Sequence, residues 1–176
     1  MLKEISKCSK CNLCNNQKPL LDKKYKCDVM WVGLSAKKVN DVNESIPLCN
    51  DTNSGKIIEL IEKELPNLNF YKTNLVKCLP LDESNKLRYP FISEMNFCID
   101  NLLLEIKKLE PKIIFVLGKK TYDFISKYFS KNMIDMNKVV YIEHPSYIYV
   151  YKRKNVADYV KKVINICRDR IDNIWK

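Results

Sequence analysis

Cysteine is the residue type with most chemical potential in this chain, and three of the eight cysteines stand at every third position in CSKCNLC, residues 8–14. Thiols at this spacing can form disulfides, bind a metal ion or hold an iron–sulfur cluster. The opening MLKEISKCSK has no apolar stretch of signal-peptide length, so we expect a cytoplasmic protein. In that reducing compartment, metal ligands or buried thiols are better interpretations than disulfides.

Nitrogen ligands are scarce, because the chain has a single histidine, His144. The formal net charge is +10, from 31 basic and 21 acidic residues. An excess of this size favours a polyanionic partner such as nucleic acid, although charge alone does not select one. No run approaches the ~18–20 apolar residues of a membrane span, so no membrane partner is expected.

Strands and helices are expected to alternate along one domain, residues 1–176, because no repeat, low-complexity run or flexible linker divides the chain. Runs rich in β-branched and aromatic residues predict strands at 28–33, 70–77, 112–118 and 139–144. Helical patterns lie at 53–65, 91–110 (with Ser93 as its cap), 119–129 and 155–175. This alternation indicates a three-layer α/β/α sandwich around a mainly parallel, four-stranded sheet.

Polar residues follow the expected strands at the points where each strand ends. In a parallel sheet, ligands bind beyond the C-terminal ends of the strands. Gly33, Asn74, Gly118 and His144 fall at those ends, and Cys78 lies just beyond the second. Convergent polar groups at such an edge predict a ligand site.

The order and the residue motifs of these segments resemble those of the uracil-DNA glycosylase superfamily, particularly its iron–sulfur branch. The matching pieces are the CxxC with its leucine, the glycine loop that reaches a proline, TNLVKCLP, a further helical cysteine, PKIIFVLG and HPS, over roughly residues 8–150. TNLVKCLP together with the CxxC is specific evidence for this resemblance, whereas HPS alone is weak evidence. The resemblance implies an enzyme that flips a nucleotide out of DNA and hydrolyses its base–sugar bond.

The resemblance also implies a [4Fe–4S] cluster on four cysteines, which correspond to Cys8, Cys11, Cys78 and Cys98. Cys14 forms a second CxxC with Cys11 and is an alternative to Cys8, although the leucine after Cys11 favours the first frame. Structural zinc on four thiolates is the other chemical interpretation. The remaining thiols are interpreted as buried or incidental: Cys27, Cys49 and Cys167.

Two site residues follow from the resemblance. Asn74 corresponds to the asparagine that reads the pyrimidine edge, since an amide both donates and accepts hydrogen bonds. His144 corresponds to the histidine that supports the base oxygen as negative charge develops. A strand-end turn and a structural histidine are the alternative interpretations of these residues.

The loop after the first strand departs from the family pattern. Leu34 follows Gly33 where the family has an acidic residue, and leucine cannot orient water. Asp41 and Glu44 are candidates to replace that acid, or are solvated loop carboxylates. Leu48 follows a proline where the family has an aromatic residue that stacks on the flipped base.

The segment HPSYIYVYKRKN predicts a surface that faces DNA. In the family, the loop after His–Pro inserts an apolar side chain into the base stack. The candidates for this wedge are Tyr147, Ile148 and Tyr149. The candidates for phosphate contacts are Lys152, Arg153 and Lys154. The alternative is a tyrosine-rich strand end with solvated charges.

We therefore predict a monomeric DNA glycosylase that removes uracil or a modified pyrimidine, in base excision repair or in defence against phages with altered DNA. One alternative is a DNA-binding module that has kept the fold and the cluster but lost catalysis. Another is a zinc-bearing RNA-binding or interaction protein in which the motif matches are coincidental.

Overall fold

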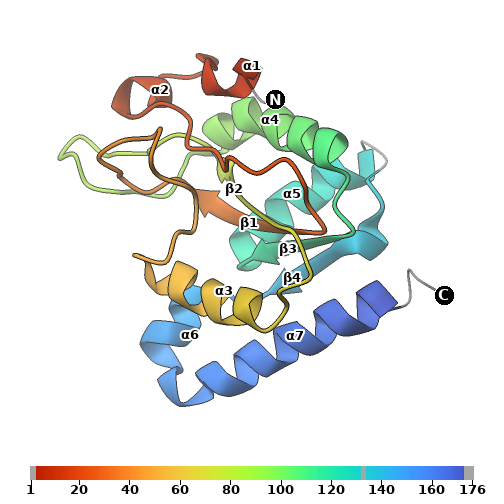
Figure 1. Cartoon of the computed structure of the whole chain (residues 1–176). Helices are drawn as coiled ribbons and strands as arrows, with labels where there is room; N and C mark the ends of the chain where they lie inside the picture. Colours follow the sequence, from red (N-terminus) through yellow and green to blue (C-terminus); the bar gives the residue numbers. More distant parts are fainter. Residues whose placement is uncertain (1–2, 132–133, 173–176) are drawn as a thin grey trace.

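A parallel sheet lies between two layers of helices in the computed structural model, which describes residues 3–131 and 134–172 (Figure 1). Its strands run in the order β2-β1-β3-β4, and each neighbouring pair is parallel. Their bounds are β1 Val29–Ser35, β2 Phe70–Val76, β3 Ile113–Leu117 and β4 Val139–Ile142. The predicted three-layer α/β/α sandwich with a parallel four-stranded sheet is confirmed.

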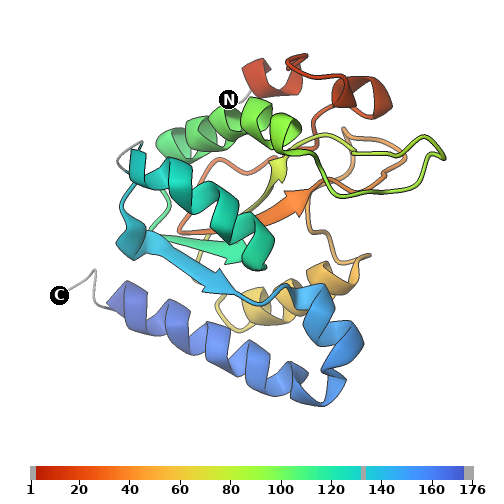
Figure 2. The ribbon, with the colours of Figure 1, turned by 180° about the vertical axis from the view of Figure 1, so that it is seen from behind.

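Helices cover both faces of the sheet (Figures 1 and 2). On one face lie α4 (Ile92–Leu109) and α5 (Lys119–Lys131), and on the other lie α3 (Asn53–Lys63), α6 (Pro145–Tyr151) and α7 (Val156–Asp172). The N-terminal segment, with α1 (Lys3–Ser6) and α2 (Leu13–Asn16), lies beside α4. Two 3₁₀ turns complete the elements: η1 Met136–Lys138 and η2 Arg153–Asn155.

Alternate residues of β1 belong to different cores, as expected for a strand with helices on both faces. Met30 and Val32 pack in the cluster that includes α4 and α5, whereas Val29 and Trp31 pack in the cluster with α3 and α7. The Trp31 ring stacks on Phe115 of β3, with ring centroids 4.8 Å apart. Burial of both faces makes the central strands rigid supports for the groups at their ends.

Two details of the predicted elements need correction. Ser93 is not the cap of α4, because the helix begins at Ile92 and Ser93 lies within its first turn. The orphan N–H of Phe91 instead donates to Glu94 Oε2 at 2.7 Å. The segment after His144 forms the short helix α6 rather than a loop or strand end.

The last predicted helix is confirmed as α7 up to Asp172, and its predicted residues 173–175 lie outside the described ranges. Within those ranges, no helix combines the length and the apolar character needed to cross a membrane.

Candidate active site

A cavity of about 440 Å³ opens near the carboxyl ends of the strands. Leu34 lies near the end of β1, Asn74 lies on β2, Leu48 comes from the loop after β1, and His144 follows β4. The structure therefore brings these four predicted site residues together. The other lining residues are Leu20, Ser35, Lys37, Pro47, Thr52, Ser54, Leu87, Arg88 and Tyr89.

Gly33 leaves room for the Asn74 amide. The two residues are partners in the parallel register of β1 and β2. A Cβ atom at position 33 would lie 2.3 Å from Asn74 Oδ1, far inside van der Waals contact. Asn74 is buried yet lines the cavity, so its amide can meet a ligand there. Gly33 is thus a supporting residue of the cavity wall.

A buried ion pair holds β2 against α4 directly behind Asn74. The side chains of Lys77 and Glu105 are both fully buried, with Nζ 2.5 Å from Oε2. Lys77 Nζ also donates to Thr73 Oγ1 and to the Asn74 carbonyl, each at 2.6 Å. Glu105 accepts further hydrogen bonds from Tyr71 Oη at 2.9 Å and from Thr73 Oγ1. We call these residues, Tyr71, Thr73, Lys77 and Glu105, the buried network.

His144 is held in one orientation at the start of α6. The backbone N–H of Ser146 donates to Nδ1 at 3.3 Å, and Ser146 Oγ lies 2.8 Å from the same atom. A backbone N–H can only donate, so Nδ1 accepts and the neutral ring carries its proton on Nε2. Burial lowers the pKa of His144 below its ordinary 6.5, because desolvation disfavours the imidazolium.

The turn after β3 lies against the same imidazole. Gly118 has φ +86°, and a Cβ atom there would lie 3.4 Å from His144 Cβ. The left-handed backbone favours glycine, and the absence of a side chain lets β3 end beside the ring.

Lys37 is a charged residue that lines this cavity. Its ammonium forms an ion pair with Asp51, which also accepts a hydrogen bond from Cys49 Sγ at 2.6 Å. Burial is the largest single influence on the pKa of the Lys37 ammonium and lowers it, but the hydrogen bonds and charges of Asp51 and Cys49 together outweigh burial and raise the pKa. The sequence carried no signal for this pair, because both residues belong to an aperiodic loop.

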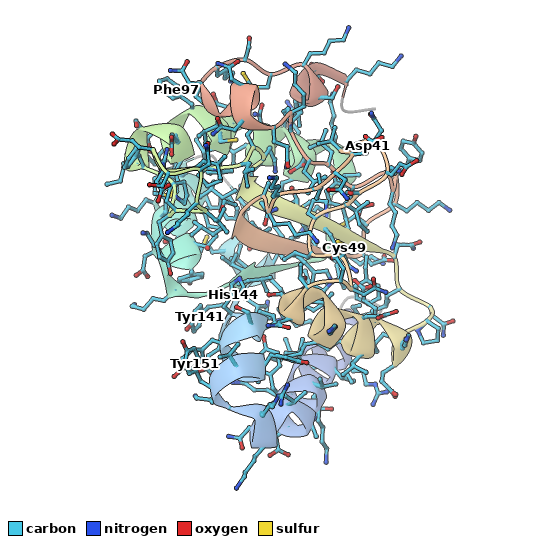
Figure 3. The ribbon with its side chains drawn as sticks, turned by 90° about the vertical axis from the view of Figure 1, so that its left-hand side faces the viewer. Asp41, Cys49, Phe97, Tyr141, His144 and Tyr151 are labelled. Carbon is cyan, nitrogen blue, oxygen red and sulfur yellow. The ribbon has the colours of Figure 1, made fainter. Side chains whose placement is uncertain are left out.

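The two candidate replacements for the missing acid lie apart from the cavity. Asp41 is exposed, and its Oδ1 accepts a hydrogen bond from the Asn43 N–H at 2.7 Å. Figure 3 shows Asp41 well separated from His144. Glu44 is also exposed, and neither residue is among those that line the cavity. Among the described lining residues none is a carboxylate.

Helix α6 corrects one of the predicted DNA contacts. Ile148 is 2 % exposed and packs in the α3–α7 core, so it cannot be a surface wedge. The helical period turns Tyr147, which is 45 % exposed, to the outside. Tyr149 packs partly against the core, under the Arg153 guanidinium. Lys152 pairs with Glu143 at 2.9 Å.

A groove of about 560 Å³ adjoins the cavity on the α6 side. Figure 3 shows Tyr151 of this groove on the side of α6 near His144. Leu34, Tyr89 and His144 line both hollows, so they mark the junction between them. The remaining groove residues are Leu117, Gly118, Lys119, Lys120, Thr121, Ser146, Tyr147, Val150 and Tyr151. Exposed lysines and tyrosines are suited to the phosphates and bases of a nucleic acid.

Five thiols line a separate, much smaller hollow of about 10 Å³ between the N-terminal segment, β2 and α4. They are Cys8, Cys11, Cys14, Cys78 and Cys98, which are the four predicted ligands and the alternative. Residues almost a hundred positions apart thus meet at one place. Among the described residues, no group of three or more His, Cys, Asp or Glu side chains is arranged to hold a single metal ion.

Polar hydrogens point at two of these sulfur atoms. The backbone N–H of Lys77 donates to Cys98 Sγ at 3.4 Å, and Asn101 Nδ2 donates to Cys8 Sγ at 3.5 Å. Burial, followed by the charges of the neighbouring thiols, raises the pKa of Cys78. N–H donors around clustered sulfurs are the surroundings that suit thiolates bound to a metal or cluster.

Sequences of one protein superfamily resemble this chain. The family model of the Uracil DNA glycosylase superfamily matches residues 19–168. A Type-4 uracil-DNA glycosylase of Sulfurisphaera tokodaii is 29 % identical over 158 residues, 87 % of this chain and 67 % of that protein. A second, of Saccharolobus solfataricus, is 28 % identical over 154 residues, 85 % of this chain and 68 % of that protein.

A solved structure supports the fold. The crystal structure of wild-type SMUG2 from Pedobacter heparinus has a TM-score of 0.61 and 16 % identity, over 84 % of this chain and 77 % of that chain. The family match covers most of the sequence and includes Asn74, Cys78, Cys98 and His144. The chain belongs to the uracil DNA glycosylase superfamily.

Proposed function

We propose that this chain is a DNA glycosylase that takes a flipped pyrimidine into the cavity and hydrolyses its N-glycosidic bond. The main support for the proposal is that Asn74 and His144 line the same cavity in a member of this superfamily. The two relatives named Type-4 uracil-DNA glycosylase support the same activity.

Asn74 would select the base. Its amide presents a donor and an acceptor, which match adjacent acceptor and donor groups on a pyrimidine edge. The buried network fixes β2 behind it, through the Lys77 bond to the Asn74 carbonyl. A fixed amide discriminates between bases because a wrong edge leaves buried polar groups unpaired.

His144 would stabilise the leaving base. As the C1′–N bond breaks, its electron pair moves to the base, and the sugar becomes oxocarbenium-like. The neutral ring can donate Nε2–H to the base oxygen on which negative charge develops. Water then adds to C1′ and loses a proton, and the base anion takes one up. The Lys37 ammonium lies in the same cavity wall, where its ion pair with Asp51 balances its charge.

In this protein, stabilisation of the leaving base contributes more to the rate of base release than activation of water does. The described lining contains no carboxylate, and Leu34 occupies the position after Gly33. Leu34 and Leu48 also give the cavity an aliphatic wall. We propose that this wall suits a uracil-like or modified pyrimidine, such as those of altered phage DNA.

Base release should depend on pH through the neutral form of His144. Because burial lowers its pKa below 6.5, more than half of the rings are neutral at pH 6.5, and the neutral fraction falls as the pH drops further. We expect single-turnover rates to fall on acidification, with the midpoint of the fall below pH 6.5. An acidic limb centred at or above pH 6.5 would contradict the neutral-donor role.

The direct test is release of bases from a panel of DNA duplexes that contain uracil, a thymine mismatch, hypoxanthine, or hydroxymethylated or glucosylated cytosine. Alkali-labile abasic sites on one duplex, lost with His144→Ala, would establish the glycosylase and name its base. DNA binding that decreases with salt, without release from any duplex, would favour the second candidate, a binding module that has lost catalysis. The cavity lining without a carboxylate is the observation that favours this second candidate.

We also propose that the five-thiol hollow holds a [4Fe–4S] cluster, since its sulfur ligands and N–H donors fit that group. Cys11, Cys78 and Cys98 would be three ligands, and Cys8 or Cys14 the fourth. A cluster bound there would cross-link the N-terminal segment to β2 and α4.

The cluster proposal predicts a brown protein that absorbs near ~400 nm and contains iron and acid-labile sulfide. Cys78→Ser should remove the colour and most of the iron, because one ligand of four is lost. Cys167→Ser is the matched control, since Cys167 is buried in the opposite core and should leave both unchanged. Comparison of Cys8→Ser with Cys14→Ser identifies the fourth ligand. A colourless wild-type protein with zinc and no sulfide would replace the cluster with structural zinc.

A further inference from the structure

Tyr89 is an exposed ring at the entrance of the cavity, and nothing in the activity proposed above uses it. It is 69 % exposed, on the segment between β2 and α4. It lines the cavity that contains Asn74, and it also lines the groove on the α6 side. A nucleotide that passes from the groove into the cavity would therefore pass this ring.

The backbone of Tyr89 is firmly held. Arg88 donates to the Tyr89 carbonyl from Nη1 at 3.0 Å and to the Leu81 carbonyl from Nε at 2.9 Å. The same guanidinium donates to both carboxylate oxygens of Glu94, at 2.9 and 2.6 Å, and lies 3.9 Å from the Phe91 ring centroid. A two-point contact of this kind anchors the loop to the first turn of α4.

The ring itself has a partner on the groove side. The Lys120 ammonium lies 4.0 Å from the Tyr89 ring centroid, in cation–π contact. Lys120 lies in the first turn of α5, which follows β3, so a rigid element supports the ring. The Tyr89 ring is thus held in position before any ligand binds, although it remains exposed.

The cavity otherwise offers aliphatic surface to a base. Its apolar walls are Leu20, Leu34, Pro47, Leu48 and Leu87. Apart from the imidazole of His144, Tyr89 carries the one aromatic ring among the described lining residues. Bases have π faces, and their stacking on aromatic side chains tolerates different sequences.

We propose that Tyr89 stacks on the extruded base at the cavity entrance and is the aromatic contact by which this chain holds a flipped nucleotide. The inference rests on the proposed glycosylase function, because it assumes that a base enters this cavity. Tyr89 acts in binding, and Asn74 and His144 keep their roles in selection and bond cleavage.

The test compares two DNA duplexes that differ at one position. One carries 2′-fluoro-2′-deoxyuridine, whose fluorine resists cleavage, and the other carries a tetrahydrofuran abasic analogue without a base. Affinities of the wild type, Tyr89→Ala and Tyr89→Phe are measured for both. Tyr25→Ala is the matched control, because Tyr25 is 71 % exposed and is not among the residues lining either hollow.

Loss of the ring should weaken binding to the uridine duplex by about 5- to 150-fold, the range for one stacked base. Binding of Tyr89→Ala to the abasic duplex should stay within about twofold of the wild type, as should both affinities of Tyr89→Phe and Tyr25→Ala. An equal loss on both duplexes, or no loss on either, would overturn the inference. Thermal unfolding of each variant identifies any that do not fold.

Base release by the wild type separates this inference from the function on which it rests. If the wild type releases a base but Tyr89→Ala binds both duplexes normally, the Tyr89 contact is wrong and the glycosylase stands. If the wild type releases no base but Tyr89→Ala selectively loses the uridine duplex, the contact stands and the catalytic proposal is wrong.

Discussion

Replacement of His144 by alanine should lower the rate of base release by about 10²- to 10³-fold, the usual cost of removing one donor to a developing anion. The proposed donor is Nε2–H, because Nδ1 accepts the Ser146 N–H. DNA affinity should change little, since the donor acts mainly when the base leaves. Single-turnover rates and equilibrium binding on the best duplex of the panel measure both quantities.

A second variant separates catalysis from folding. His144 also caps α6, since its ring accepts the Ser146 N–H, so alanine removes a cap as well as a donor. His144→Asn keeps a good capping oxygen but lacks the imidazole. If the asparagine variant restores base release to the wild-type rate, the role of His144 is structural and the proposed donor role is wrong. A loss equal to that of alanine supports the donor.

Replacement of Glu105 by alanine should destabilise the protein by about 3–5 kcal/mol, because it leaves the Lys77 ammonium buried without its carboxylate. Tyr71 and Thr73 would lose their acceptor at the same time. Urea unfolding, followed by circular dichroism, measures the change in the free energy of unfolding. The loss is expected to exceed that of any single surface substitution.

Two controls test this explanation. Lys77→Met combined with Glu105→Leu removes both charges and should recover much of the stability, because no unpaired charge is left. Lys63→Ala breaks the exposed pair with Glu59 on α3 and should have no measurable effect. If Glu105→Ala unfolds at the same urea concentration as Lys63→Ala, the buried network contributes nothing and our account of it fails.

The sheet and the thiol hollow were predictable because their signals are local. Strands β1 and β3 are largely apolar runs buried on both faces, and the helices between the strands follow a 3.6-residue period. Parallel strands must end at one edge, so Asn74 and His144 could be placed together before their contacts were known. The resemblance to the family implied the four ligands but left Cys14 as an alternative to Cys8, and the structure places both at the hollow.

The positions of loop residues were predicted poorly, because the sequence of an aperiodic segment does not indicate the path of its backbone. Asp41 was chosen for its charge and position in sequence, yet its loop takes it away from the cavity. Tyr89 had no feature in the sequence to mark it, yet it lines the cavity. Ile148 was expected at the surface because its segment was taken for a loop, and the helical period of α6 turns it into the core.

The sequence by itself determined the parallel α/β fold and the edge of the sheet at which Asn74 and His144 lie, and its resemblance to the family pointed to the cysteines that line the thiol hollow. Only the tertiary structure decided which loop residues reach the cavity, and that Lys77 meets Glu105 in the interior. The physical reason is that period and spacing act over a few residues. A buried charge pair, or a ring held at a cavity entrance, depends on contacts between segments far apart in the chain.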